Sequence, residues 1–290
     1  MRITVERLSY RYGEKDKNLT VPALCDVSLE INEGDFFGII GKTGSGKSTF
    51  VQHINGLIKV QKDSGKVTVG DFDLTDKKCD YKALRSKIGM VFQYPEYQLF
   101  AETVKEDVGF GLKNFRPDIK EEEAESLVKE AVELCGLNYD AIKDVSPFDL
   151  SGGQKRRVAI AGVIVSKPEV LVLDEPAAGL DPKGKEEFLQ LLVKFHKTFA
   201  KTIIIVSHDM DLIAEYCNRA AVFKGGRITA VGTPKEIFSD YENVIDCGLQ
   251  LPVTAAVVKT LKEKGVNIDC DFTVNSFVAA VKRFKDGGDL

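Results

Sequence analysis

Residues 41–48, Gly-Lys-Thr-Gly-Ser-Gly-Lys-Ser, decide the fold, and they follow the apolar run 36–40, Phe-Phe-Gly-Ile-Ile. They match the P-loop pattern, in which a glycine-rich turn joins a buried strand to a helix. The glycines let backbone N–H groups surround phosphate oxygens, and the helix directs its positive dipole end at the same anion. Lys47 adds a cation for the β- and γ-phosphates, and Ser48 supplies a hydroxyl for Mg²⁺. A glycine turn that opens a helix by chance does not need this lysine and serine, so the sequence predicts a nucleoside triphosphate site.

The composition is typical of a soluble globular protein. With 290 residues, the chain is long enough for one large α/β domain and a smaller appendage. The apolar fraction of 43% and the charged fraction of 29% exclude a disordered chain. The formal net charge of −4 argues against a general nucleic-acid partner, because nucleic-acid binding calls for a basic face.

Targeting and cysteine patterns favour the cytoplasm. No apolar run approaches the roughly 20 residues that a membrane helix needs. The N-terminus, MRITVERLSYRY, mixes charged and apolar residues from the start, unlike a signal peptide. The cysteines lack a CxxC pair, which favours reduced thiols over a disulfide framework or a zinc site. They are Cys25, Cys79, Cys135, Cys217, Cys247 and Cys270.

Hydrophobic periodicity in the first half of the chain predicts strands and then helices. Residues 1–34 alternate with period two, which favours antiparallel strands with one face in water. After the P-loop and its helix, we expect strands at 65–70 and 86–92. The helical subdomain spans about 100–165, and 120–135 has the clearest helical spacing, with acidic residues near its beginning.

The second half returns to buried strands and ends in a helical appendage. Residues 166–232 alternate continuous apolar strands with helices, which indicates a parallel sheet covered on both faces. Thr233-Pro234-Lys235-Glu236 forms a capping box with proline at the first helical position. We therefore expect a main domain over 1–232 and a helical appendage over 233–290.

A second motif indicates magnesium and hydrolytic chemistry. The apolar strand 170–173 ends at Asp174-Glu175, where open α/β sheets place their ligands. One carboxylate can hold Mg²⁺ through its water shell, and the next can accept a proton from an attacking water. In isolation the Asp-Glu pair could also be a solvated turn.

A second anion-binding turn removes this ambiguity. Leu150-Ser151-Gly152-Gly153-Gln154 opens a helical run, so its N-terminus can also receive an anion. One nucleotide rarely needs two phosphate-binding turns in the same chain. We infer that the second turn serves a nucleotide held by another subunit.

Taken in order, these motifs resemble those of an ATP-binding-cassette (ABC) ATPase. GKTGSGKS, LSGGQ and VLVLDEP are followed by Gly179-Leu180-Asp181 and Ser207-His208-Asp209, and the match covers about residues 3–232. The resemblance implies a P-loop α/β core, an antiparallel β subdomain and a helical subdomain that carries LSGGQ. It also implies Mg²⁺-dependent ATP hydrolysis.

The resemblance assigns a role to each matching residue. Glu175 is the catalytic base, His208 the switch histidine that bonds the γ-phosphate, and Gln93 the glutamine that touches Mg²⁺ and the attacking water. Tyr12 stacks on adenine, although it could instead be a core aromatic, with Tyr10 as a competitor. The implied metal ligands are Ser48, Gln93 and Asp174. The remaining implied nucleotide contacts are Gly41, Lys42, Thr43, Gly44, Ser45, Gly46, Lys47, Thr49, Ser151, Gly152, Gly153, Gln154 and Asp181, the last linking the two sites of a dimer.

Two longer stretches are similar to the ATPase component of energy-coupling factor (ECF) transporters, the EcfA/CbiO family. They are VFQYPEYQLFAETVKEDVGFG, residues 91–111, and SPFDLSGGQKRRVAIAG, residues 146–162. Tyr94 favours the second ATPase isoform. Ala177 departs from the threonine that is common in the family, at a position without proton or metal chemistry. The resemblance implies import of vitamins or of transition-metal ions such as cobalt.

The resemblance also implies partners and a location at the cytoplasmic face of the cell membrane. The expected partners are a second identical or homologous ATPase, a transmembrane coupling protein and a substrate-binding membrane S-component. Exposed aromatics in a loop favour Tyr94–Phe100 as the docking segment for the coupling protein, with Leu99 or Phe100 anchoring the loop instead. Apolar residues at helical spacing in the appendage either pack on its core or join two ATPase subunits. They are Val274, Phe277, Val278, Val281 and Phe284.

Two other classes of ABC protein remain as alternatives. A conventional importer or exporter ATPase carries the same nucleotide motifs. A soluble ABC ATPase is less compatible, because this chain has one cassette, no heptad run and no CxxC pair. His53 and His196 lack a motif around them, and we expect ordinary helix residues there.

Overall fold

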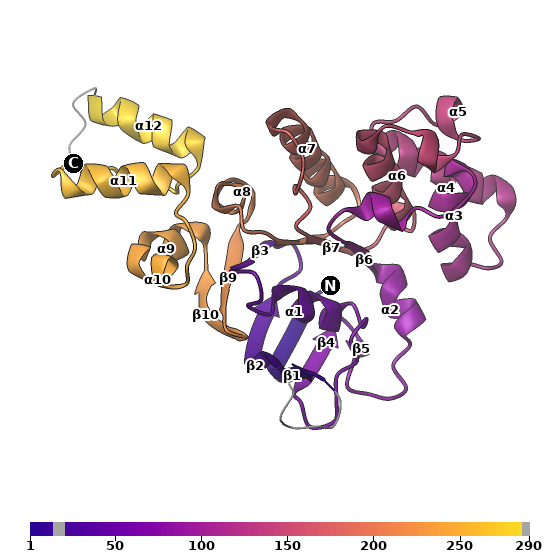
Figure 1. The fold of residues 1–290 in the computed structure, drawn as a ribbon, viewed down its shortest axis with the longest axis horizontal. Helices are drawn as coiled ribbons and strands as arrows, with labels where there is room; N and C mark the ends of the chain where they lie inside the picture. Colours follow the sequence, from indigo (N-terminus) through magenta and orange to yellow (C-terminus); the bar gives the residue numbers. More distant parts are fainter. Residues whose placement is uncertain (14–20, 286–290) are drawn as a thin grey trace.

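The computed structural model describes residues 1–13 and 21–285, which form two sheets, a helical lobe and a helical appendage (Figure 1). The antiparallel sheet has the order β2-β1-β4-β5, and the larger sheet has the order β10-β9-β3-β8-β7-β6. The strands of the first are β1 (Ile3–Tyr12), β2 (Val21–Ile31), β4 (Lys66–Val69) and β5 (Phe72–Asp73). Those of the second are β3 (Phe36–Gly41), β6 (Ile88–Val91), β7 (Val170–Asp174), β8 (Thr202–Val206), β9 (Arg219–Lys224) and β10 (Arg227–Gly232).

The larger sheet is covered on both faces, as its continuous apolar strands predicted. Its strands β9, β3, β8, β7 and β6 run parallel, and only β10 pairs antiparallel with β9. Along β8, Ile203 and Ile205 face the core shared with most helices, whereas Ile204 faces the core shared with the antiparallel sheet. Parallel strands end at one edge, so the loops after β3, β6, β7 and β8 are brought together there.

One predicted boundary was wrong. We expected a strand at 86–92, but β6 begins at Ile88 because the preceding residues form helix α2 (Tyr81–Lys87). The Asp80 side chain caps this helix by accepting the N–H groups of Lys82 and Ala83. The cap fixes the beginning of α2, and the helix ends at Lys87 because Ile88 already has the extended backbone of the strand.

The helical lobe lies beyond the β6 edge of the sheet (Figure 1). Its elements are η1 (Pro95–Gln98), α3 (Val104–Phe115), α4 (Glu121–Leu134), α5 (Tyr139–Ile142), η2 (Pro147–Asp149) and α6 (Gly152–Ile164). These elements extend from residue 95 to residue 164. The helices α3, α4 and α6 pack on one another through buried side chains that include Val108, Val128 and Val158.

The appendage lies at the opposite end of the molecule from this lobe (Figure 1). Its helices are α9 (Pro234–Ser239), α10 (Tyr241–Asp246), α11 (Val253–Glu263) and α12 (Val274–Lys285). Thr233 and Glu236 form the predicted capping box at α9. Ala255, Phe272 and Ala280 belong to the same buried cluster as the main domain, so the appendage packs on that domain.

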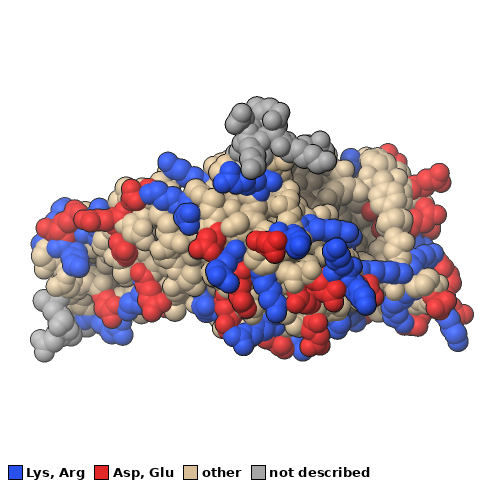
Figure 2. Space-filling model, turned by 90° about the horizontal axis from the view of Figure 1, so that it is seen from below, with Lys and Arg blue, Asp and Glu red and all other residues tan. Residues whose placement is uncertain are grey.

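The remaining helices are α1 (Lys47–Ile54), α7 (Pro182–Thr198) and α8 (Met210–Tyr216). Within residues 1–13 and 21–285, no helix combines the length and the apolar character needed to cross a membrane. Figure 2 shows acidic and basic side chains interspersed over one face of the molecule.

Candidate functional site

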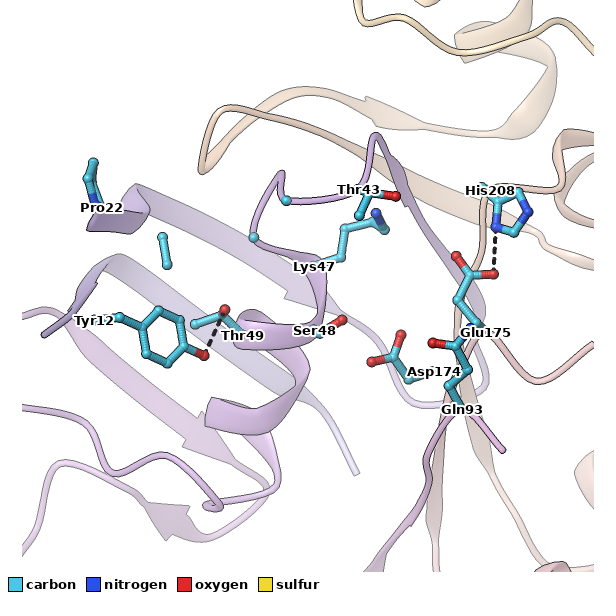
Figure 3. A pocket seen from close by; sticks show the side chains of 13 residues that line it. Tyr12, Pro22, Thr43, Lys47, Ser48, Thr49, Gln93, Asp174, Glu175 and His208 are labelled. Carbon is cyan, nitrogen blue, oxygen red and sulfur yellow. Dashed lines mark hydrogen bonds and ion pairs between the residues drawn. The ribbon is translucent and has the colours of Figure 1, made fainter. Parts of the chain in front are cut away.

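A cavity of about 500 Å³ lies at the carboxyl edge of the larger sheet, next to the antiparallel sheet (Figure 3). It gathers residues that are as far apart in sequence as Tyr12 and His208. The residues that line it are Tyr12, Pro22, Ala23, Thr43, Gly44, Gly46, Lys47, Ser48, Thr49, Gln93, Asp174, Glu175 and His208. Most of the predicted nucleotide residues therefore meet here.

The P-loop has the open backbone that a phosphate needs. It joins β3 to α1, and Gly46 has a φ of 104°. A Cβ there would overlap the carbonyl oxygen of Ala23, so only glycine fits. Around Gly44, in contrast, the space for a Cβ is empty among the described residues. The Ser45 hydroxyl is buried without a hydrogen-bond partner within that part of the chain, which fits an anion in the loop.

Lys47 lies inside this loop with its ammonium bound to the chain. Its Nζ donates to the carbonyl oxygens of Gly41 at 2.7 Å and Lys42 at 3.0 Å. Burial lowers the pKa of Lys47, while the charges of Glu175 and Asp174 oppose that shift. Phosphate oxygens can replace the two carbonyl partners and restore the stability of the charged form. Lys42 itself is exposed and does not line the cavity.

The carboxylate of Asp174 lies near Ser48 at the floor of the cavity (Figure 3). Asp174 is the last residue of β7 and only 9% exposed. Burial raises its pKa, and a hydrogen bond with Ser48 acts in the opposite direction. A hydroxyl and a buried carboxylate are oxygen ligands of the kind that Mg²⁺ prefers, with phosphates and waters completing the shell. These residues fit a magnesium ion. A bound Mg²⁺ would offset the cost of burying the ionised carboxylate of Asp174.

Glu175 and His208 form a pair at the next edge of the cavity. The Glu175 Oε2 atom lies 2.8 Å from His208 Nδ1. Glu175 has a φ of 49°, a left-handed conformation that is uncommon outside glycine and that turns the chain as it leaves β7. Gln93, two residues after β6, lies beside them (Figure 3). A carboxylate held by a histidine beside an amide can orient and deprotonate a water.

Tyr12 rather than Tyr10 lines the cavity. Tyr12 is 44% exposed, and its hydroxyl lies 3.1 Å from the Thr49 hydroxyl oxygen, which fixes the ring. Tyr10 packs edge-on against Tyr12 and against buried His53, with ring centroids 4.9 and 4.8 Å apart. This exposure removes the alternative that Tyr12 is a core residue. His53 Nδ1 donates to the carbonyl oxygen of Thr49 and His196 Nδ1 to that of Ala200, each on or next to its own helix, as expected of ordinary helix residues.

The Ser151–Gln154 turn lies outside this cavity, at the beginning of α6 in the helical lobe. Ser151 and Gln154 cap the helix reciprocally, with Gln154 Oε1 accepting the Ser151 N–H at 3.0 Å. Gly152 and Gly153 are exposed, with no described atom near the position of a Cβ. The turn is therefore exposed and lies outside the cavity that the P-loop of the same chain lines.

Asp181 is also placed away from the cavity. Its Oδ1 accepts the Gly184 N–H at 2.8 Å and caps α7, so within one subunit it acts as an ordinary N-cap.

The sequence interpretation missed three residues that contribute to the site. Pro22 and Ala23 reach the cavity from β2, and the only sequence signal is that β2 follows β1 in a hairpin.

Arg156 is the third residue that was missed. It is 6% exposed on α6, and its guanidinium donates to the carbonyl oxygens of Pro176 and, at 3.0 Å, Ala178. It therefore ties the Ser151–Gln154 helix to the loop that follows Glu175. Its position two residues after the LSGGQ motif was the available signal.

Known proteins are similar in sequence to this chain over nearly its whole length. The profile of the ABC transporter family matches residues 24–178. An energy-coupling factor transporter ATP-binding protein EcfA2 from Clostridium tetani is 46% identical over 268 residues, which are 92% of this chain and 91% of that protein. The EcfA2 protein of Clostridioides difficile is 47% identical over 93% of both chains. These names agree with the prediction of the second isoform.

Solved structures of ABC cassettes have folds similar to that of this chain. The structure of cbiO1 from Clostridium perfringens, part of an ABC transporter complex, has a TM-score of 0.72 and 38% identity, covering 89% of this chain and 98% of that one. An ATP-binding cassette solved as a dimer in a post-hydrolysis state with ADP and phosphate has a TM-score of 0.70 and 30% identity, covering 80% of this chain and 98% of that one. The chain therefore belongs to the ABC transporter family, among the ATP-binding proteins of energy-coupling factor transporters, and it is an ATPase.

Proposed function

We propose that this chain works as one of two ATPase subunits on the cytoplasmic side of an ECF importer that takes up a vitamin or a transition-metal ion such as cobalt. A transmembrane coupling protein and a substrate-binding S-component complete the complex. The observation that carries this proposal is the division of the nucleotide motifs. Lys47, Asp174 and Glu175 meet in one cavity, while Ser151 faces outward on another lobe.

In this proposal, each residue of the cavity has a separate role in ATP hydrolysis. Ser48, Asp174 and Gln93 would hold Mg²⁺, which neutralises charge on the phosphates when bound. Lys47 and the P-loop N–H groups bind the β- and γ-phosphates, and Tyr12 stacks on the base. Glu175 accepts the proton of the attacking water. His208 bonds the γ-phosphate, and its Nδ1, 2.8 Å from Glu175 Oε2, also orients the carboxylate of that base.

Ser151 and Gly153 bind the γ-phosphate of a nucleotide on a second subunit, because this turn cannot reach its own P-loop. ATP then joins two subunits head to tail, and hydrolysis releases them. Size-exclusion chromatography of the Glu175→Gln variant tests this: we expect a dimer with ATP and a monomer without it, given the right partner. Elution as a monomer at saturating ATP with that partner contradicts the proposal.

The appendage contributes to the same association. On α12, Val274 is 60% and Val278 44% exposed, whereas Phe277 packs partly on the core. We therefore propose that Phe277 packs on the core while the exposed valines join the two subunits. Val278→Glu should weaken dimer formation if the exposed part joins the subunits, and an unchanged dimer would leave the stripe without this role.

The segment Tyr94–Phe100 is the proposed docking site for the coupling protein. Tyr97 is 84% and Phe100 57% exposed, while Leu99 is 6% exposed and anchors the loop. Asp107 Oδ2 accepts the N–H of Phe100 at 2.8 Å and holds the loop on α3. Exposed aromatics on a loop that is hydrogen-bonded to α3 suit a groove for a cytoplasmic helix.

Tyr97→Ala should reduce co-purification with the membrane subunit and transport, with the ATPase activity of the isolated protein near normal. Leu57→Ala, which trims another exposed apolar side chain, is the control. An equal loss of isolated ATPase activity would make the loop merely structural. A conventional ABC importer or exporter would give a different outcome in the same pulldown, without a separate S-component.

A further inference from the structure

The appendage is attached to helix α8, which begins two residues after His208 (Figure 1). Val253, the first residue of α11, donates its N–H to Asp211 Oδ1 at 2.8 Å. Val274, the first residue of α12, donates its N–H to Glu215 Oε2 at 3.2 Å. Two carboxylates of α8 therefore cap the N-termini of two appendage helices.

The geometry of α8 makes this double contact specific. Asp211 and Glu215 are four residues apart and lie on one face of the helix. Carboxylates at helix N-termini are favourable, because they satisfy free N–H groups and match the helix dipole. Pro252, the N-cap of α11, makes no side-chain cap, so Asp211 supplies the one that its own segment lacks.

The other end of α8 is tied to the nucleotide site. Asp209 caps α8 by accepting the Leu212 N–H at 3.0 Å, and it also pairs with Lys185 of α7. His208 immediately precedes Asp209, and its Nδ1 lies 2.8 Å from Glu175 Oε2. A shift of α8 would therefore move the histidine that orients the base.

Apolar packing joins the same elements. Leu189, Leu212 and Phe272 line a surface groove of about 440 Å³ between α7, α8 and the beginning of α12, and all three belong to the buried core shared with the main domain. The two carboxylate caps add directional hydrogen bonds to this packing.

A second contact joins the appendage to the P-loop. Gly248, in the turn after α10, has a φ of 69°, and a Cβ there would overlap the end of the Lys42 side chain. The carbonyl oxygen of Lys42 accepts a hydrogen bond from Lys47. The appendage therefore lies against both the phosphate-binding loop and α8.

We propose that the C-terminal appendage positions His208 for hydrolysis through α8, with Asp211 and Glu215 as the positioning residues. The proposal rests on the role of His208 given above. Coupling between two sites is reciprocal. Nucleotide in the cavity should therefore also stabilise the appendage.

The test is the double variant Asp211→Ala/Glu215→Ala in the full chain. Loss of one helix cap lowers the equilibrium constant for docking of the appendage on α8 by a factor of about five. Because fewer molecules then hold His208 in position, we expect kcat to fall about three- to tenfold. The P-loop is untouched, so KM for ATP should stay within about twofold. Asp211→Asn/Glu215→Gln keeps both acceptor oxygens and should recover most of kcat. Glu263→Ala removes an exposed carboxylate at the end of α11 and is the matched control.

Hydrogen exchange gives the second measurement. In the Glu175→Gln background, MgATP should slow exchange of residues 252–276, and the double Ala variant should lose this protection. The proposal is overturned by a kcat within twofold of wild type, or by a rise in KM equal to the fall in kcat. If the double variant does not fold, Asp211→Ala alone is judged by the same criteria. A wild-type chain without ATPase activity would instead contradict the catalytic role itself.

Discussion

Replacing Glu175 by glutamine should separate ATP hydrolysis from ATP binding. The carboxylate is 18% exposed and is held by His208 Nδ1 at 2.8 Å. Glutamine has the same length, and its amide oxygen can keep that hydrogen bond, but it cannot accept a proton from water. The substitution therefore removes the base and little else.

The expected loss follows from this geometry. A positioned general base contributes about 10²–10⁴-fold to the rate, so kcat should fall by that factor, or about 3–5 kcal/mol in activation free energy. Binding should persist, because the P-loop N–H groups and Lys47 remain. Glu175 also supports the charged form of Lys47, so its loss changes one neighbour of the ammonium without removing a phosphate contact.

The assay combines steady-state phosphate release with the binding of a fluorescent ATP analogue. Glu169→Gln is the control, because Glu169 precedes the same strand β7 at the opposite edge of the sheet and pairs with Lys87. It should hydrolyse ATP at close to the wild-type rate. Hydrolysis by Glu175→Gln near the wild-type rate would refute the assignment of the base, and loss of ATP binding would refute the division of roles.

Other substitutions test the remaining parts of the site. Lys47→Ala should raise the Kd for ATP at least tenfold, since it removes a charged partner of the phosphates, and an unchanged Kd in the same fluorescence assay would contradict this. Tyr12→Ala should weaken ATP binding by about 1 kcal/mol while Tyr12→Phe keeps the ring; equal affinities for the two variants would exclude stacking. Burial raises the pKa of Asp174, so the folded protein holds the proton of this carboxyl more tightly than the unfolded chain does. The stability of the nucleotide-free protein therefore falls as the pH rises from the unfolded to the folded pKa of Asp174. Asp174→Asn should therefore raise the Tm of the nucleotide-free protein at neutral pH and abolish Mg²⁺-dependent hydrolysis; a lower Tm by calorimetry would reverse the sign of the argument. Burial raises the pKa of Cys135 to about 12, so mass spectrometry after alkylation at pH 8 should find half-buried Cys25 modified well before Cys135.

The amino-acid sequence by itself determined the fold class and the chemistry of the nucleotide site. Each motif is a short contiguous run whose function depends on local backbone geometry, as in the glycines before Lys47 or the apolar strand before Asp174. Helix caps such as Thr233 are equally local. These features are encoded within a few residues, so they can be recognised without knowing which strands are neighbours.

Only the tertiary structure decided which distant residues meet. Period-two spacing gives Tyr10 and Tyr12 the same expected face, but register shifts along β1 on both sides of Tyr10 break that alternation. The open position of Ser151, the buried Arg156 and the reach of Asp211 to α11 depend on the packing of whole lobes. No local pattern encodes such contacts, because they result from strand order and helix packing over the entire chain.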